Sequence, residues 1–186
     1  MPLVAELEAI RHQIDEINTR ATNLCRGLSE EQLAWRPQPD KWSIAENLVH
    51  LQTTTAVMLP PVDQAIASAR EHNLYGEGPH HIGLLGRLYV WYCEPPPKIK
   101  LPAPKQLKPI LTGPAVEALP GFLASQQHMV ARLEQANGLD LCRVRFQSPL
   151  ASFIRMDLLA LFSVFTAHER RHMAQAAEVR KHLEPV

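Results

Sequence analysis

Apolar residues recur at alternating steps of three and four through the first 28 residues of the chain. The series consists of Leu3, Leu7, Ile10, Ile14, Ile17, Ala21, Leu24 and Leu28. This heptad spacing puts the side chains on one face of an α-helix and is typical of long helices in antiparallel bundles. The pattern therefore predicts a long amphipathic helix at the start of the chain.

Two capping boxes mark the helix starts that follow. Ser29 with Gln32 predicts a short helical segment, and Ser43 with Glu46 predicts the start of a second long helix. The buried stripe expected for this second helix is Ile44, Leu48, Leu51 and Thr55. The pair Pro60-Pro61 should kink or interrupt it, because proline removes a backbone donor and clashes with the preceding turn.

Residues 71–114 differ from the rest because they hold many of the 16 prolines of the chain. Regular structure is not expected through most of this insert. An apolar stretch over residues 84–92 predicts one short helix packed on the bundle. The insert is either a cover for the surface or a lid over a pocket, since long loops in compact domains are often functional.

Two more long helices complete the pattern. The third is expected from near Pro120, a favourable residue in a first turn, to Gly138, with His128 opposite its apolar stripe and in solvent. Residues 141–152 predict an extended connection. The fourth helix is expected from about Met156 to His182. The chain is therefore predicted to be all-α, with four long helices in a single domain over residues 1–186.

Two histidines occupy the inward stripe of the fourth helix. This stripe is Leu158, Leu161, Phe165, His168, His172, Gln175 and Val179. Residues four apart lie on one helix face, so His168 and His172 can bind one metal ion. Burying imidazoles in a core costs free energy unless they are ligated or hydrogen-bonded. The pair therefore indicates either a metal site or two hydrogen-bonded core histidines.

A third histidine, His50, ends the string Trp42-Ser-Ile-Ala-Glu-Asn-Leu-Val-His50, at the edge of the second helix's stripe. A histidine from another helix would complete a set of three nitrogen ligands and leave a coordination position open. A divalent ion in such a site lowers the pKa of bound water or thiol and polarises a substrate.

Composition narrows the range of partners. Lys and Arg number 19 and Asp and Glu number 19, so no attraction to nucleic acid or to an anionic membrane is expected. There is no apolar run long enough to span a bilayer, and the first residues do not resemble a signal peptide. Cys25, Cys93 and Cys142 are widely spaced, so free thiols in a cytoplasmic protein are expected.

Several motifs taken together resemble the DinB-like superfamily of four-helix-bundle metal proteins. They are Leu28-Ser-Glu-Glu-Gln-Leu-Ala-Trp35-Arg36-Pro37, Lys41-Trp42-Ser43, His50-Leu51 and His168-x-x-x-His172-x-x-Gln175. The resemblance spans nearly the whole chain and implies an up-down-down-up order of helices. The long proline-rich insert departs from the family pattern, so the substrate of a relative does not carry over.

The resemblance also implies a function. In this superfamily the histidines that match His50, His168 and His172 bind a divalent metal, usually zinc or nickel. Members are commonly homodimers. Characterised relatives include transferases and isomerases that use a low-molecular-weight thiol, and other members are described as metal-dependent hydrolases. The resemblance therefore implies a small-molecule substrate, with S-transfer placed ahead of hydrolysis by analogy alone.

The string His168-Glu-Arg-Arg-His172 also matches the H-E-x-x-H signature of zinc proteases, with Glu169 as general base. Gln175 and Glu178 stand where the extended signature has Gly and His, which argues against such a protease. Glu169 is either a base acting on bound water or a solvated carboxylate. Gln175 is either a hydrogen-bond partner of a ligand imidazole or an amide in the bundle seam.

The sequence is compatible with two classes of function. One is a metal-dependent enzyme, transferase or hydrolase, and the other is a non-enzymatic metal-binding or stress-response protein with a structural metal. An exchangeable ligand on the metal would favour the first class, and a closed set of four protein ligands would favour the second.

Overall fold

The computed structural model describes residues 2–96, 102–151 and 153–183. The elements are α1 (Ala5–Cys25), α2 (Glu30–Ala34), α3 (Ile44–Glu71), α4 (Leu84–Cys93), η1 (Lys105–Leu107), η2 (Ala115–Glu117), α5 (Ala118–Ala136), β1 (Arg145–Gln147), β2 (Arg155–Asp157) and α6 (Leu158–Lys181). Both predicted capping boxes are present, at the starts of α2 and α3. The fold is all-α apart from one short pair of strands.

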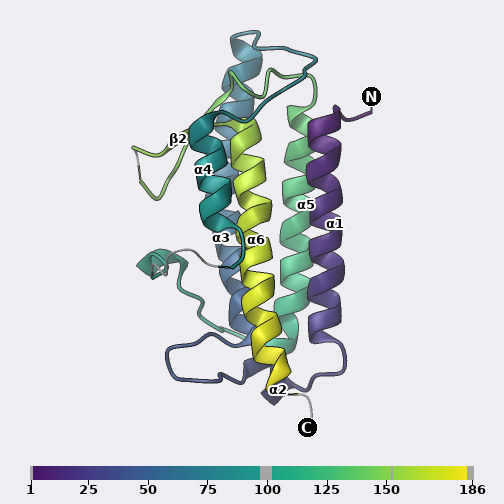
Figure 1. Ribbon diagram of the computed structural model, residues 1–186, viewed down its shortest axis with the longest axis vertical. Helices are drawn as coiled ribbons and strands as arrows, with labels where there is room; N and C mark the ends of the chain where they lie inside the picture. Colours follow the sequence, from purple (N-terminus) through teal and green to yellow (C-terminus); the bar gives the residue numbers. More distant parts are fainter. Residues whose placement is uncertain (1, 97–101, 152, 184–186) are drawn as a thin grey trace.

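Four long helices form the bundle (Figure 1), in the up-down-down-up order. Helices α1 and α6 run in one direction, and α3 and α5 run in the other. The contacting pairs are α1 with α5, α1 with α6, α3 with α5, and α3 with α6. Since α3 and α5 are parallel, the chain between them must return along the length of the bundle.

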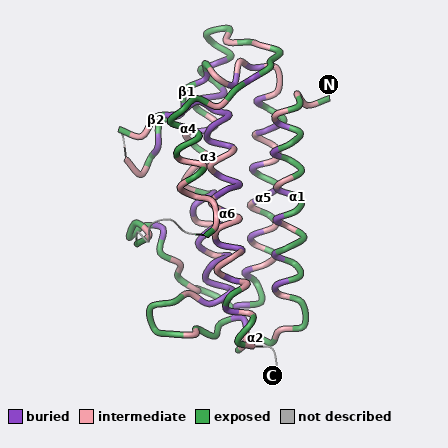
Figure 2. Tube along the Cα trace, viewed as in Figure 1, coloured by how far each residue is buried: buried purple, intermediate pink, exposed green. Residues whose placement is uncertain are grey.

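Buried residues recur along all four long helices (Figure 2), and most of the apolar ones belong to two clusters. The first includes Leu7, Ile14 and Phe162, and the second includes Ala21, Leu48 and Met173. Six positions of the predicted α1 seam, Leu7 to Leu24, are buried, as the spacing predicted. Polar residues of α3, α5 and α6 lie buried as well, and the candidate site is made from them.

Pro60-Pro61 were expected to kink or interrupt the second helix. They do not interrupt it, because α3 continues through both residues to Glu71, whereas the kink stays a prediction. The carbonyls that lose a partner belong to Ala56 and Val57. Ala56 is exposed and Val57 is half-buried, so water can reach the helix there. Beyond the prolines, Val62 and Ile66 are buried in the core, and this packing stabilises the continuation of the helix.

Among its described residues, the proline-rich insert contains one short α-helix and the three-residue η1. As predicted, a short helix, α4, packs on the bundle, against α6. Gly86 allows the close approach, since a Cβ at this position would lie 2.7 Å from the Cβ of Ala160. Residues 97–101, which include Pro97 of the insert, lie outside the described part of the chain.

The connection predicted as extended over 141–152 contains a turn and β1, which pairs antiparallel with β2. The fourth helix begins at Leu158 and not at Met156, because Met156 pairs with Phe146 in this small sheet. The side chain of Asp157 then caps α6 by accepting a hydrogen bond from the Ala160 amide, at 2.7 Å. Within the described ranges, no helix is both long and apolar enough to cross a membrane.

Candidate metal centre

Three histidines from two helices converge inside the bundle. His50 lies on α3, and His168 and His172 lie on α6. The Nε2 atom of His168 is 3.4 Å from that of His50 and 3.2 Å from that of His172. His50 and His172 are buried and His168 is partly buried. The structure thus brings together the three histidines that the sequence selected, and their ligand atoms are close enough to hold one metal ion.

Hydrogen bonds on the far side of two rings fix which nitrogen faces the centre. His50 Nδ1 is 2.7 Å from the carbonyl oxygen of Leu107, so Nδ1–H donates. His172 Nδ1 is 2.9 Å from Oδ1 of Asn47. A flip of the Asn47 side-chain amide would break the hydrogen bond that its Nδ2 donates to the Ser43 carbonyl, at 2.8 Å. In the neutral rings the Nε2 lone pairs of His50 and His172 therefore point inward.

The electrostatics of the cluster keep the rings neutral. Burial lowers the pKa of His50, against the effect of its bond to Leu107. Burial, with His50 and Arg171 as lesser causes, lowers the pKa of His168 to about 3. The pKa of His172 is lowered strongly by burial and by the other two histidines. Neutral imidazole is the form that binds metal, so the site is in its ligating state at neutral pH.

Trp42 covers the cluster from the segment before α3. Its ring stacks on that of His172, with centroids 5.7 Å apart and an angle of 18°, and lies 4.8 Å from that of His50. Glu46 holds this segment by accepting hydrogen bonds from the Ser43 amide and from Arg36. Trp42 therefore packs on two of the candidate ligands. Trp35 lies elsewhere, against His182.

The proline-rich insert reaches the site through η1. Leu107 is 3% exposed, and its carbonyl oxygen is the partner of His50 described above. This contact joins positions 57 residues apart in the sequence. The insert therefore covers part of the site at this point, whereas its movement as a lid stays a prediction.

Glu169 is fully buried, so the interpretation as a solvated carboxylate is wrong. Its Oε2 accepts a hydrogen bond from Nε2 of Gln126 on α5, at 2.9 Å. Its Oε1 and the Oε1 of Gln126 have no partner among the described residues. Burial raises the pKa of Glu169 to about 8, so at neutral pH the group is mainly a neutral acid. Its role as a general base stays a prediction.

Gln175 is half-buried one turn beyond His172, and a hydrogen bond of its side chain raises the pKa of that histidine slightly. Whether it orients a ligand stays a prediction. Asn47 and Leu107, the two partners that orient the rings, were not predicted from the sequence. The position of Asn47, three residues before His50 on α3, was available as a signal for the first, whereas no signal marked Leu107. His128 is exposed, as expected, and the three cysteines are free thiols.

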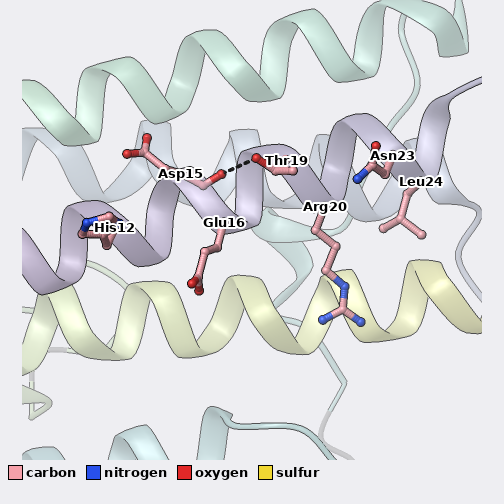
Figure 3. A pocket seen from close by; sticks show the side chains of 7 residues that line it. All are labelled: His12, Asp15, Glu16, Thr19, Arg20, Asn23 and Leu24. Atoms are coloured by element: carbon pink, nitrogen blue, oxygen red, sulfur yellow. Dashed lines mark hydrogen bonds between the residues drawn. The ribbon is translucent and has the colours of Figure 1, made fainter.

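A shallow groove on the outer face of α1 does not belong to this centre (Figure 3). It is lined by side chains of α1 alone, which include Asp15, Glu16 and Arg20. The bond drawn there, from the Thr19 hydroxyl to the Asp15 carbonyl, lies within the helix. The buried histidines, and not this groove, are therefore the candidate functional site.

The donor set fits a divalent ion. The Nε2 atom of His168 lies 3.4 Å from that of His50 and 3.2 Å from that of His172, close to the separation of about 3.4 Å expected for ligands at 2.0–2.1 Å from one zinc ion. The inward lone pairs of His50 and His172 are oriented to bind a cation at the centre. Among the described residues, the group of mutually close ligand atoms here contains the three histidines and no cysteine or carboxylate.

An all-α bundle with three converging histidines defines the class of protein. The model of the DinB superfamily matches residues 13–176, and the chain belongs to this superfamily. A solved structure with a similar fold is YfiT from Bacillus subtilis, described as a probable metal-dependent hydrolase with an unusual four-helix bundle topology. The TM-score is 0.62 at 12% identity, over 95% of this chain and 87% of YfiT. A search among curated proteins found no match.

Proposed function

We propose that the protein is a divalent-metal-dependent enzyme that acts on a small molecule, with His50, His168 and His172 as the metal ligands. The observation that carries the proposal is the convergence of three Nε2 atoms, with the rings of His50 and His172 oriented by hydrogen bonds from outside the cluster. A site with three nitrogen ligands leaves a position for water, thiol or substrate, as in catalytic zinc sites. Zinc or nickel is the expected ion.

The residues around the centre have separate roles in this proposal. When bound, a divalent ion supplies a Lewis acid that lowers the pKa of a coordinated water or thiol. Leu107 and Asn47 hold the imidazoles in the ligating tautomer. Arg171 is close enough to depress the pKa of His168 and His172, so it brings positive charge beside the centre. This charge favours a substrate or cosubstrate that carries an anionic group.

The reaction is proposed as S-transfer with a low-molecular-weight thiol or as hydrolysis, since both need an activated nucleophile. The family analogy supports S-transfer, and the description of YfiT as a probable hydrolase supports hydrolysis. Incubation of the metal-loaded protein with electrophiles plus several thiols, and separately with small esters and amides, distinguishes the two. Product formation that requires the thiol identifies a transferase.

The alternative is a non-enzymatic metal-binding or stress-response protein with a structural ion. Substitution of cobalt for the native metal separates the alternatives, because the cobalt absorption spectrum reports coordination. We expect small thiols and anions to shift the spectrum of the cobalt protein. A spectrum that responds to no added ligand would indicate a closed site and favour the structural role.

A homodimer and a cytoplasmic location are part of the same proposal. Helix α4 carries exposed apolar side chains on its outer face, namely Leu84, Leu85, Leu88 and Trp91. An exposed apolar face of this kind is typical of interaction surfaces. Free cysteines suit a reducing compartment. Sedimentation analysis of Leu88→Glu, with Arg87→Glu as control, tests whether this face joins two copies.

A further inference from the structure

A second group of metal-binding residue types lies at the other end of α3. The segment that leaves α3 runs beside the segment that leaves α5, at the end of the bundle where α4 and α6 begin (Figure 1). Tyr75 and Leu139 form an isolated β-bridge, and the Asp140 amide donates to the Leu74 carbonyl at 2.9 Å. Gly76 permits this approach, since its Cβ would lie 3.1 Å from the Cβ of Asp140.

This pairing brings three different ligand types together. The side chains of His80, Asp140 and Cys142 offer ligand atoms that all lie within 4.8 Å of one another. Nδ1 of His80 is 3.9 Å from Oδ1 of Asp140, which is too long for a hydrogen bond. The two segments are 60 residues apart in sequence, so the group exists only in the folded protein.

His80 is an unusual residue to bury in this way. Its side chain is 5% exposed, and its Nε2 has no hydrogen-bond partner among the described residues. Its backbone amide donates a hydrogen bond to Oε1 of Glu6, at 2.7 Å. Buried imidazole nitrogens in native proteins normally have partners, so a histidine with one unpartnered nitrogen and the other 3.9 Å from a carboxylate needs a functional explanation.

The charges around the group favour a cation. Asp140, Asp157 and Glu6 all lie close enough to Cys142 to raise the pKa of its thiol, in addition to the effect of burial. The thiol donates to the His81 carbonyl at 3.3 Å. A shallow groove of about 310 Å³, lined in part by Glu6, His80 and His81, lies beside the group. A divalent ion would balance the carboxylate of Asp140 and a thiolate at position 142.

We propose that His80, Asp140 and Cys142 form a second divalent-metal site, for an ion of the zinc type. Nitrogen, oxygen and sulfur ligands together suit zinc better than magnesium or calcium, which prefer oxygen alone. Zinc requires these atoms to be about 3.5 Å apart, so the 3.9 Å between His80 and Asp140 and the other separations, all within 4.8 Å, shorten when the ion binds. Binding deprotonates the Cys142 thiol and releases that proton to solvent. The ion joins the segment before α4 to the segment before β1, and the proposal does not depend on the function of the three-histidine centre.

Cobalt titration of the full chain tests the second site, because only this site supplies a sulfur ligand. In a variant with His50→Ala, His168→Ala and His172→Ala, we expect one equivalent of cobalt to bind and to produce a thiolate-to-cobalt charge-transfer band. The wild type should bind two equivalents. Binding of a single equivalent by the wild type, with no such band in either protein, would overturn the proposal.

Single substitutions identify the ligand atoms. Cys142→Ser should abolish the band, and Asp140→Asn should weaken cobalt binding, whereas Cys25→Ser is the matched control and should change neither. In the wild type, zinc should slow alkylation of Cys142 and leave that of Cys25 unchanged. A band that persists in Cys142→Ser, or equal alkylation of Cys142 with and without zinc, would contradict the assignment.

Discussion

Within one turn, α6 presents imidazoles on one side, toward α3, and a carboxyl group on another, toward α5. Burial is the main cause of the pKa shifts on both sides, lowering that of His168 and raising that of Glu169. Both shifts favour the neutral form, as expected for desolvation. The two sides differ in their hydrogen bonds. Two of the histidines have outer partners and inward lone pairs, whereas Glu169 has one bond to Gln126 and one oxygen without a partner.

This difference shows that burial alone does not make a metal site. The same helix, in the same layer of the bundle, buries polar groups on both sides. On the α3 side, the hydrogen-bond partners of His50 and His172 lie outside the cluster. The Nε2 lone pairs of these two rings therefore converge. On the α5 side, the carboxyl group and the amide face each other and form a neutral pair. Orientation by outer hydrogen bonds separates a potential ligand set from a buried polar contact.

The largest expected effect comes from removing the converging lone pairs. Replacing His168 by Ala should remove most of the bound metal, because two nitrogen ligands cannot hold the ion as three do. Elemental analysis of protein purified without a polyhistidine tag measures this loss. His128→Ala is the matched control, since His128 is an exposed histidine. Full metal content in His168→Ala would remove His168 from the ligand set.

Glu169→Gln should stabilise the metal-free protein at pH 8 by roughly 2–4 kcal/mol. The pKa of Glu169 is raised to about 8 in the folded state. Between about pH 4.5 and 8 the unfolded carboxyl group loses its proton and the folded one keeps it, so stability falls as pH rises. Urea denaturation at pH 5 and pH 8 measures the effect. Glu134→Gln, an exposed position on α5, is the control, and an equal pH dependence in Glu169→Gln and wild type would contradict the assignment.

Asn47→Ala should lower metal affinity by about 10- to 100-fold, the usual effect of removing a hydrogen-bond partner of a ligand. The reason is that His172 Nδ1 loses its acceptor. Asn47→Asp keeps an acceptor and should retain the affinity, although it loses the bond to the Ser43 carbonyl. Competition with a chromophoric chelator measures the affinities. Weak binding by both variants would show that Asn47 acts through the start of α3 and not through His172.

The smallest expected effect concerns acid sensitivity without metal. The pKa values of the three histidines are lowered in the folded state. As pH falls below about 6.5 the unfolded rings take up protons before the folded ones, so stability should fall by about 1 kcal/mol or more per pH unit. A variant with all three histidines replaced by Gln should lose the part of the pH dependence of stability that these histidines cause. Denaturation at pH 6.5 and 5.5 compares the two, and identical slopes would contradict the prediction.

The features that were predicted correctly from the sequence are those set by a regular local spacing of residues. The heptad series of α1, the caps of α2 and α3, and the stripe of α6 with His168 and His172 all depend on local spacing, and all are present. The family motifs added the helix order, together with His50, which lies beside the apolar stripe of its own helix.

The remaining features depend on contacts between distant segments. Leu107 orients His50 through its backbone carbonyl. Because every residue has this group, the residue type gives no signal of the contact. Burial of Glu169 depends on Gln126 of another helix. The continuity of α3 through Pro60 depends on solvent access at Ala56 and on packing beyond it. Local patterns cannot report any of these, because each is decided by the tertiary structure.

The order of the helices has a consequence for the rate of folding. Consecutive helices α1 and α3 do not form a local hairpin, and α3 meets α5 only after the chain has returned along the bundle. Each interface of the bundle therefore closes a long loop before its contacts form. Proteins rich in distant contacts fold more slowly than bundles built from successive hairpins. We expect this bundle to refold more slowly than an up-down-up-down bundle of equal length, and the histidines of α3 and α6 to meet late in that process.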